Sequence, residues 1–381
     1  MKISKLQLVE YRKPFKVGFH SPQIHRRAAE SVLLKLVFSN GAISFGECAP
    51  RNYVTRENCQ TVTDVIQNIF SPVLFDAEIE SLEDVIVTLN KLENLCLTVE
   101  NRPYFSALAA VDLALLDALS RQRQSHISEI IGRPSGQRVN RSISIPFLPT
   151  DIIAALFSCL QNAIPFDAVK VLMKNDLKEN IARVAFIRSM IGPQMPIRIE
   201  ANGKWSFQEA LANIDKLVPF GVASVEEPIT EPKPERLHRL REKVDINIIL
   251  DESVCSLSDA KRMIAMEACD GFNLKLSKCG GLLKLMAIGD LAHENHLRCQ
   301  LGTHVGEGPV LEAAGLYAAS SHPVFNNYEG YSSLLFLDFI KDNSRLRDIA
   351  EQPIYLGPGI GDNTHSIASM FDSPHMIEIS Q

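Results

Sequence analysis

The sequence lacks the features that mark membrane proteins and nucleic-acid-binding proteins. No run approaches the about 18 uninterrupted apolar residues of a membrane-spanning helix. There is no polybasic run and the formal net charge is −6, so neither nucleic acid nor an anionic membrane surface is an indicated partner. The first residues, Met1 to Leu8, contain no apolar core of a signal peptide. We therefore expect a soluble, cytoplasmic protein.

Paired cysteines and low-complexity tracts are also lacking. The eight cysteines are scattered without a Cys-x-x-Cys pair, which predicts reduced thiols. What is present is a long chain with an ordinary globular composition, since its 381 residues are 46% apolar and 22% charged. That length accommodates a (β/α)8 barrel of roughly 250 residues and a second, smaller domain. A soluble enzyme is the expected class.

Four ionisable residues follow one another at nearly constant spacing. Glu200, Glu226, Asp251 and Lys275 lie 26, 25 and 24 residues apart, and each stands at the end of a short apolar run. This interval matches one β-strand plus one helix. In a (β/α)8 barrel the carboxyl ends of successive strands point into one mouth, so the spacing gathers three carboxylates and an ammonium at a single site. Such a site suits a hard divalent cation.

The remaining chain divides into two regions. Residues 1–50 alternate between apolar and polar side chains and contain an Asn40-Gly41 turn, which predicts an antiparallel sheet, and helical spacing follows from about Cys59 to Leu119. We expect an N-terminal α+β domain over 1–125, a barrel over 126–350 and a tail, about 350–381, that returns to the first domain. Barrel strands are predicted from Ser142 onward.

Two turn-rich loops of the first domain are expected to cover the site. The loop after the first strand carries Phe19 and His20, and the loop after the sheet carries Arg51 and Tyr53. Their polar and aromatic side chains are candidates for substrate contact.

Several motifs in order along the chain carry a family resemblance. They are Glu200-Ala-Asn-Gly-Lys-Trp, Val225-Glu-Glu-Pro, Leu250-Asp-Glu-Ser, Asn273-Leu-Lys-Leu-Ser-Lys-Cys-Gly-Gly and, in the first domain, Gly46-Glu-Cys-Ala-Pro. Over nearly its whole length the chain resembles the enolase superfamily, specifically the muconate-lactonizing-enzyme subgroup of the mandelate racemase/muconate lactonizing enzyme family. The resemblance implies a modified TIM barrel, (β/α)8-type, with an N-terminal α+β capping domain, assembled as a homo-oligomer.

The resemblance also implies the chemistry of the site. It assigns Glu200, Glu226 and Asp251 as ligands of Mg2+, with Mn2+ as an alternative, although the family usually has Asp at the first position. Lys275 matches the base that removes the α-proton of a small carboxylate substrate, giving a metal-stabilised enediolate. The nearby cation is expected to lower the pKa of Lys275. Residues expected to support the ligands are Asn202, Glu252 and Glu307.

The chain departs from the subgroup on the second barrel strand. The subgroup shows Lys-x-Lys there, whereas this chain has Lys170-Val-Leu172. Leucine can neither donate nor accept a proton, so the second base is in question. Lys170 and His304 remain candidate acid/base residues, and Lys174 either reaches the site or begins the following loop.

Three functions are consistent with these residues. The first is an isomerase, either an epimerase or racemase or a cycloisomerase. The second is a lyase that eliminates water by syn chemistry with Lys275 alone, as in o-succinylbenzoate synthase. The third is a non-catalytic barrel that binds a carboxylate. The intact carboxylates favour an enzyme, and we expect an isomerase. The sequence does not specify the substrate, because one barrel scaffold supports many reactions.

Overall fold

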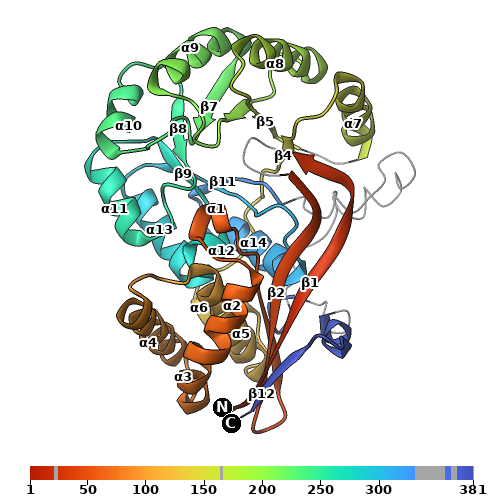
Figure 1. Cartoon of the computed structure of the whole chain (residues 1–381), viewed down its shortest axis with the longest axis vertical. Coiled ribbons are helices and arrows are strands. Elements are labelled where there is room, and N and C mark those ends of the chain that lie inside the picture. Colours follow the sequence, from red (N-terminus) through yellow and green to blue (C-terminus); the bar gives the residue numbers. More distant parts are fainter. Residues whose placement is uncertain (21–24, 164–165, 331–356, 362–366, 381) are drawn as a thin grey trace.

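Two β-sheets organise the protein. The computed structural model describes residues 1–20, 25–163, 166–330, 357–361 and 367–380. One sheet has four strands in the order β12-β1-β2-β3, and the other has eight in the order β11-β10-β9-β8-β7-β6-β5-β4. Figure 1 shows the eight-stranded sheet inside a ring of helices, with both chain termini at the opposite end of the molecule.

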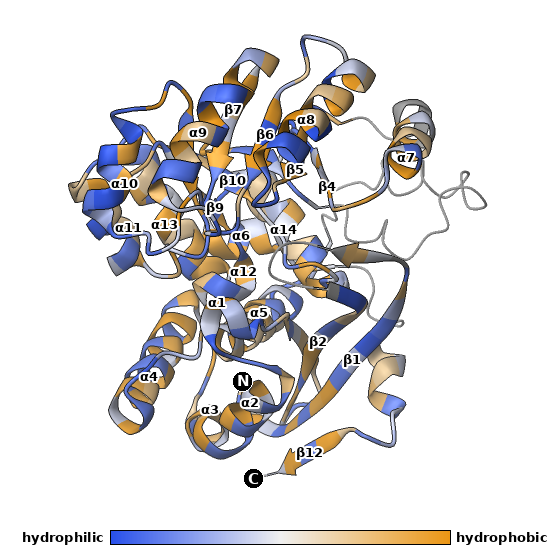
Figure 2. Cartoon of the chain, turned by 45° about the horizontal axis from the view of Figure 1, so that its top comes forward, coloured by the Kyte–Doolittle hydropathy of each residue, from blue (hydrophilic) through white to orange (hydrophobic). Residues whose placement is uncertain are grey.

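The four-stranded sheet is antiparallel throughout. Its strands are β1 (Ile3–His20), β2 (His25–Phe38), β3 (Ile43–Cys48) and β12 (Ile377–Ser380). The turn between β2 and β3 contains Gly41 with φ +82°, a conformation that glycine adopts without steric cost. β12 pairs with β1, with Leu6 opposite Ile379. Along β1 and β2 polar and apolar residues alternate, because one face of the sheet packs on the helices (Figure 2).

Helices cover one face of this sheet. They are α1 (Asn52–Thr55), α2 (Cys59–Val65), a π-helical turn (Ile66–Phe70), α3 (Ser71–Asp76), α4 (Leu82–Glu100), α5 (Phe105–Gln122) and α6 (Ile127–Ile131). A capping box of Ser81 and Asp84 starts α4. Helix α5 is buried almost all round because Ala and Leu dominate it, and it packs between β3 and the barrel.

The eight-stranded sheet is parallel and alternates with helices. The strands are β4 (Ser142–Ile145), β5 (Ala168–Leu172), β6 (Ile197–Glu200), β7 (Val222–Glu226), β8 (Asn247–Leu250), β9 (Gly271–Leu274), β10 (Arg298–Leu301) and β11 (Phe325–Tyr328). The helices are α7 (Thr150–Ala163), α8 (Leu177–Ile191), α9 (Phe207–Leu217), α10 (Pro234–Arg241), α11 (Leu257–Ala265), α12 (Leu276–Cys279), α13 (Leu282–Glu294) and α14 (Pro309–Ser321). The predicted barrel with its α+β cap is confirmed.

The two edges of this sheet meet. Tyr328 at the end of β11 forms a parallel bridge with Arg141, the residue before β4, and the Tyr328 N–H donates to the Asn140 carbonyl at 2.8 Å. The barrel is thereby nearly closed, and β5 lies four strands away from β9 in either direction. Residues at the carboxyl ends of β5 and β9 therefore face each other across the mouth.

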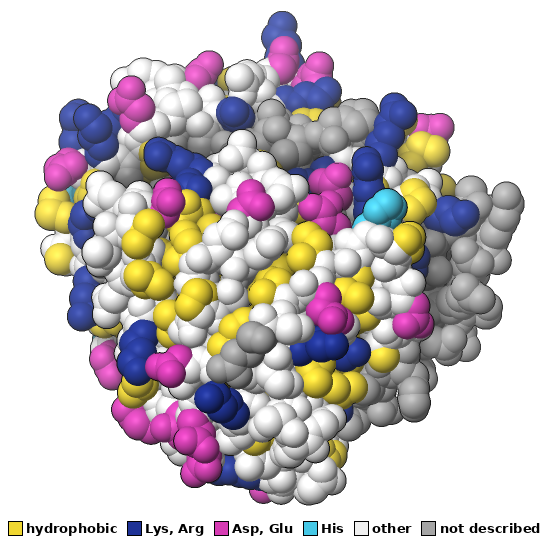
Figure 3. Space-filling view, turned by 60° about the horizontal axis from the view of Figure 1, so that its bottom comes forward, with side chains coloured by type: hydrophobic (Ala, Val, Ile, Leu, Met, Phe, Trp, Pro, Cys, Tyr) yellow, Lys and Arg dark blue, Asp and Glu magenta, His cyan; other side chains and the backbone are white. Residues whose placement is uncertain are grey.

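Charged side chains of both signs lie on the face of the molecule that Figure 3 shows. Basic, acidic and apolar side chains are mixed on this face without a large patch of one sign. Within the described residues no helix combines the length and apolarity needed to cross a bilayer. The expected boundary near residue 350 lies outside the described residues, as does the start of the tail.

Buried carboxylates join the cap to the barrel. Asp112 on α5 accepts the N–H of Leu282 at the start of α13, at 2.6 Å. Glu47 on β3 accepts the N–H groups of Gly308, Val310 and Leu311 at the start of α14. Because the first N–H groups of a helix have no partner within it, these contacts satisfy helix ends across the two domains. Asp112 thus joins the cap to the barrel through a hydrogen bond to backbone.

We expect Asp112→Ala to lower the free energy of unfolding by about 1–3 kcal/mol, because the buried Leu282 N–H loses its acceptor. Asp112→Asn keeps an acceptor oxygen. Burial raises the pKa of Asp112 from 3.8 to about 7, so its stabilising effect is complete below pH 3.8 and is lost as pH rises through 7. Urea denaturation should therefore show wild type losing stability relative to Asp112→Asn between pH 4 and 8. A pH-independent difference would contradict this.

Candidate metal and proton-transfer site

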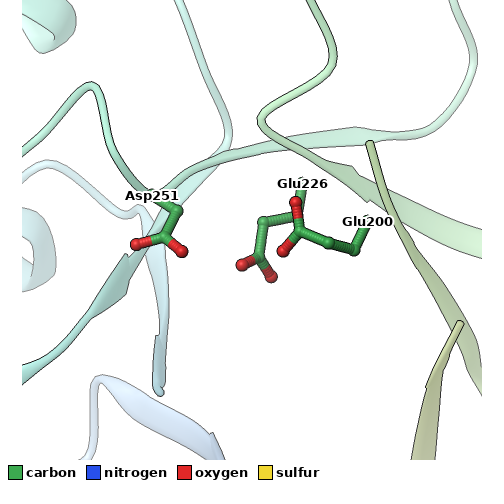
Figure 4. Close-up of side chains that lie close together, drawn as sticks. All are labelled: Glu200, Glu226 and Asp251. Atoms are coloured by element: carbon green, nitrogen blue, oxygen red, sulfur yellow. The ribbon is translucent and has the colours of Figure 1, made fainter. Parts of the chain in front are cut away.

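Three carboxylates meet at the barrel mouth. Glu200 ends β6, Glu226 ends β7 and Asp251 directly follows β8, and all three are 2–3% exposed. Carboxylate oxygens of the three residues lie within 4.8 Å of one another. Figure 4 shows their carboxyl groups turned toward a common space. Parallel strands end at the same edge of the sheet, which is why residues spaced one strand-helix unit apart converge here.

The charge state of these groups fits a divalent cation. Burial and the adjacent Glu226 raise the pKa of Glu200 well above its ordinary value. Burial also tends to raise the pKa of Glu226, but Lys170, the hydrogen bond with Glu200 and Lys275 together lower that pKa. Two carboxylates whose oxygens lie within 4.8 Å of each other do not both ionise unless positive charge lies close to them. Three buried oxygen donors within ligand distance are the set that Mg2+ accepts.

Glu226 is held from inside the barrel. Its Oε1 accepts from Asn273 Nδ2 on β9 at 2.6 Å, and its Oε2 accepts from Gln300 Nε2 on β10. Neither residue was predicted from the sequence. Both are polar residues within apolar strands of a parallel sheet, and that signal could have found them. These two amides fix the orientation of the Glu226 carboxylate.

Lys275 lies beside Asp251. Its Nζ donates to Asp251 Oδ2, and Lys278 Nζ lies 2.8 Å from Asp251 Oδ1. Burial tends to lower the pKa of Lys275, but Asp251 and Glu252 raise it well above its ordinary value. The carboxylates around Lys275 therefore favour its protonated form. Lys278 is fully buried, and Asp251 compensates its charge.

Lys170 and Leu172 share the inward face of β5, opposite Lys275. Leu172 is buried and pairs in register with Glu200, so it stands at the level of the carboxylates. Lys170 lies two residues deeper, with Nζ 3.2 Å from Glu226 Oε1 and 3.4 Å from Glu200 Oε2. Lys174 instead forms an ion pair with Glu179, and its side chain is 45% exposed. Lys174 thus belongs to the following loop.

Glu329 forms two ion pairs beneath the carboxylates, and sequence reasoning missed both of them. Glu329, the residue after β11, accepts from Lys170 Nζ at 2.8 Å and from Arg198 Nη2 at 2.9 Å. Arg198 also donates to Gln300 Oε1 and to Ser142 Oγ on β4. No sequence pattern connects Glu329 with residues on β5 and β6, because they are far apart along the chain.

His304 contacts the cap. Its Nδ1 lies 2.8 Å from the Ala49 carbonyl, so Nδ1 carries the proton. Burial, Arg51 and Lys275 lower the pKa of His304 well below 6.5, which keeps the ring neutral. Glu307 accepts the His304 backbone N–H at 2.7 Å and thus supports the His304 loop. Lys275 and Arg51 are among the charges that act on Glu307.

The predicted loop residues differ in position. Arg51 is fully buried, and its guanidinium donates to the carbonyls of Glu30, Pro50 and Val305. It joins the cap loop to the barrel, so the expectation of a substrate-contacting Arg51 is not supported by its hydrogen bonds. Tyr53 is 40% exposed and Phe19 is buried. The side chain of His20 lies outside the described part of the chain.

Two residues expected to support the ligands do lie beside them. The backbone N–H of Asn202 donates to Glu200 Oε1 at 2.8 Å. Glu252 follows Asp251 directly, and burial together with Asp251 raises the pKa of Glu252 to about 8. Trp205 is fully buried and donates to the Lys174 carbonyl, which is a packing role.

Comparisons with known proteins cover nearly the whole chain. Residues 3–132 match the model of the mandelate racemase / muconate lactonizing enzyme N-terminal domain, and residues 155–363 match the enolase C-terminal domain-like model. An L-Ala-D/L-Glu epimerase of Clostridium acetobutylicum is 28% identical over 84% of this chain and 86% of that relative. An N-succinyl-L-Arg/Lys racemase of Bacillus cereus is 24% identical over 95% of each chain.

Solved structures show the same fold. The dipeptide epimerase of Cytophaga hutchinsonii, in complex with Mg and the dipeptide D-Ala-L-Val, superposes with a TM-score of 0.83 at 22% identity, covering all of both chains. The N-succinyl Arg/Lys racemase of Bacillus cereus gives a TM-score of 0.84 at 21% identity, again over both whole chains.

We expect Glu226→Gln and Asp251→Asn each to weaken Mg2+ binding, because each removes a negative charge and an oxygen donor from the cluster. The loss should exceed the roughly 10- to 100-fold that a supporting residue costs. Calorimetric titration with Mg2+ measures it. Glu231→Gln is the control, since Glu231 pairs with Arg236 on the surface. Wild-type affinity in both site variants would remove these residues from the metal site.

Proposed function

Since this chain belongs to the mandelate racemase/muconate lactonizing enzyme family of the enolase superfamily, we propose that it abstracts the α-proton of a small carboxylate substrate at the mouth of its barrel. It is an isomerase, as its named relatives are epimerases and racemases. The observation that carries the proposal is the contact of Lys275 with Asp251, within a cluster of three carboxylates. This contact puts a proton acceptor next to the groups that would hold a metal.

Each residue of the cluster has a distinct part in this proposal. Glu200, Glu226 and Asp251 would hold Mg2+, or Mn2+ as the alternative. The bound cation would supply charge stabilisation at the carboxylate oxygens of the substrate. Lys275, held by Asp251, takes the α-proton, and epimerisation then requires a proton donor on the opposite face, for which Lys170 and His304 are the candidates. Lys278 donates to the other Asp251 oxygen and keeps that carboxylate aligned with both partners.

The substrate class proposed is a dipeptide or an N-acylated amino acid. Relatives named for such substrates span most of this chain's length, and the substrate must carry a carboxylate next to an acidic C–H for the proposed chemistry. Two further proposals rest on family resemblance and on the scattered cysteines, which predict reduced thiols. We place the enzyme in the cytoplasm and expect a homo-oligomer.

A second candidate reaction is syn elimination by a lyase. It is favoured by Leu172, which occupies the position across the barrel from Lys275 where two-base chemistry needs a proton carrier. One lysine can remove a proton and then protonate the leaving group from the same face. Cycloisomerisation also needs only one face, so a single base is compatible with both an isomerase and a lyase.

Lys275→Ala should lower the rate of α-proton exchange by about 10²- to 10⁴-fold, the usual contribution of a general base. Incubation in D2O with N-acyl amino acids and dipeptides, read by mass spectrometry, measures the exchange and detects half-reactions. Lys243→Ala serves as the matched control. Calorimetry should show that the Lys275 variant still binds Mg2+. Exchange at the wild-type rate would move the base elsewhere.

The position of Leu172 predicts the stereochemistry. With Lys275 as the sole base, one enantiomer should exchange its α-proton and be recovered with its configuration retained. Leu172→Lys should add exchange from the opposite face, whereas Leu172→Met, which stays apolar, should not. Chiral chromatography of recovered substrate beside its deuterium content measures both properties.

Racemisation by the wild type would show that a second proton carrier exists. Its loss in Lys170→Ala or in His304→Ala would then identify that carrier. Persistence in both variants would place it at a residue other than these two.

A further inference from the structure

Glu329 is a buried carboxylate that the proposed chemistry does not use. Its side chain is 5% exposed, and its two oxygens contact different cations. Oε2 lies 2.8 Å from Lys170 Nζ, and Oε1 lies 2.9 Å from Arg198 Nη2. Lys170 and Arg198 compensate the buried charge of Glu329, since each of these charges would be costly to bury alone.

Lys170 is shared unequally among its carboxylate partners. Its Nζ is 2.8 Å from Glu329, but 3.2 and 3.3 Å from the two oxygens of Glu226 and 3.4 Å from Glu200. An ammonium group has three N–H donors, and its attraction to each carboxylate weakens with distance. The shortest contact is thus made with the one carboxylate that lies outside the metal cluster.

We propose that Glu329 is a positioning residue that draws the charge of Lys170 away from Glu200 and Glu226 and so leaves their oxygens available to the metal. The inference rests on the proposed function, because it concerns the same cation site. An ammonium and a divalent cation compete for the same carboxylate oxygens. Without Glu329, the only carboxylates that remain around Lys170 in the described structure are the two ligands.

Arg198 offers a second route by which Glu329 could act. The guanidinium donates to Gln300, and the Gln300 amide donates to Glu226 Oε2. Loss of Glu329 could therefore disturb Glu226 through Arg198 and Gln300 instead of through Lys170. The two routes can be distinguished by a second substitution. Lys170→Met would abolish the effect of losing Glu329 in the first route, and Arg198→Met would abolish it in the second.

The experiment compares Mg2+ affinities by calorimetry, with the metal alone as the probe. Glu329→Gln keeps the shape of the side chain and removes its charge, and we expect affinity to fall by about 10- to 100-fold. Glu329→Asp keeps the charge and should restore most of the affinity. Glu93→Gln is the matched control, because Glu93 pairs with Lys284 away from the mouth.

The decisive comparison is made in a Lys170→Met background. There Glu329→Gln should leave Mg2+ affinity unchanged, because no ammonium remains to compete. An equal loss of affinity with and without Lys170 would overturn the inference, and abolition of the loss by Arg198→Met alone would do the same. Circular dichroism checks folding. If Glu329→Gln alone does not fold, the Mg2+ affinity of the variant that carries both Lys170→Met and Glu329→Gln is compared with that of Lys170→Met. A tenfold difference between these two affinities contradicts the proposal.

Failure of this inference is distinguishable from failure of the proposed function. If wild type does not bind Mg2+, the cation site itself is wrong. If wild type binds and Glu329→Gln binds equally well, the site stands and the role of Glu329 is rejected.

Discussion

The compensation of buried charge is the constraint on which the barrel mouth depends. Several carboxylates cannot be buried together unless positive charge lies among them. The described residues meet this condition with four carboxylates and four cations. The carboxylates are Glu200, Glu226, Asp251 and Glu329, and the cations are Lys170, Arg198, Lys275 and Lys278. A side chain in this set is therefore placed by its partners as much as by its strand.

Buried carboxylates also join the two domains, here by accepting backbone N–H groups. Glu47 and Asp112 belong to the cap and accept N–H groups at the starts of two barrel helices. The loop after β3 is further tied down by Arg51 and by the ring of His304. The groups that hold the cap in place are thus unavailable for reading a substrate through the same atoms.

The second barrel strand, β5, carries a departure from the family pattern at Leu172. The fold and, apart from the longer Glu200 side chain, the carboxylate cluster follow the family pattern, whereas Leu172 stands where the resemblance implies a proton carrier opposite Lys275. Lys170 keeps its place on the strand but is engaged by three carboxylates. One scaffold can host several reactions because the few residues at strand ends change while the strands do not. In this chain such a change lies across the barrel from Lys275.

The sequence by itself predicted the barrel, the cap and the convergence of Glu200, Glu226, Asp251 and Lys275. It could do so because strand and helix lengths repeat, and because all parallel strands end at one edge. The sequence could not predict which side chains pair with one another by hydrogen bonds or ion pairs. Lys170 meets Glu329 across 159 positions, and Gln300 meets Glu226 across 74. Only tertiary structure decided that Arg51 and His304 join the domains and that Glu329 pairs with Lys170, since these contacts depend on which side chains share a buried space once the barrel has closed.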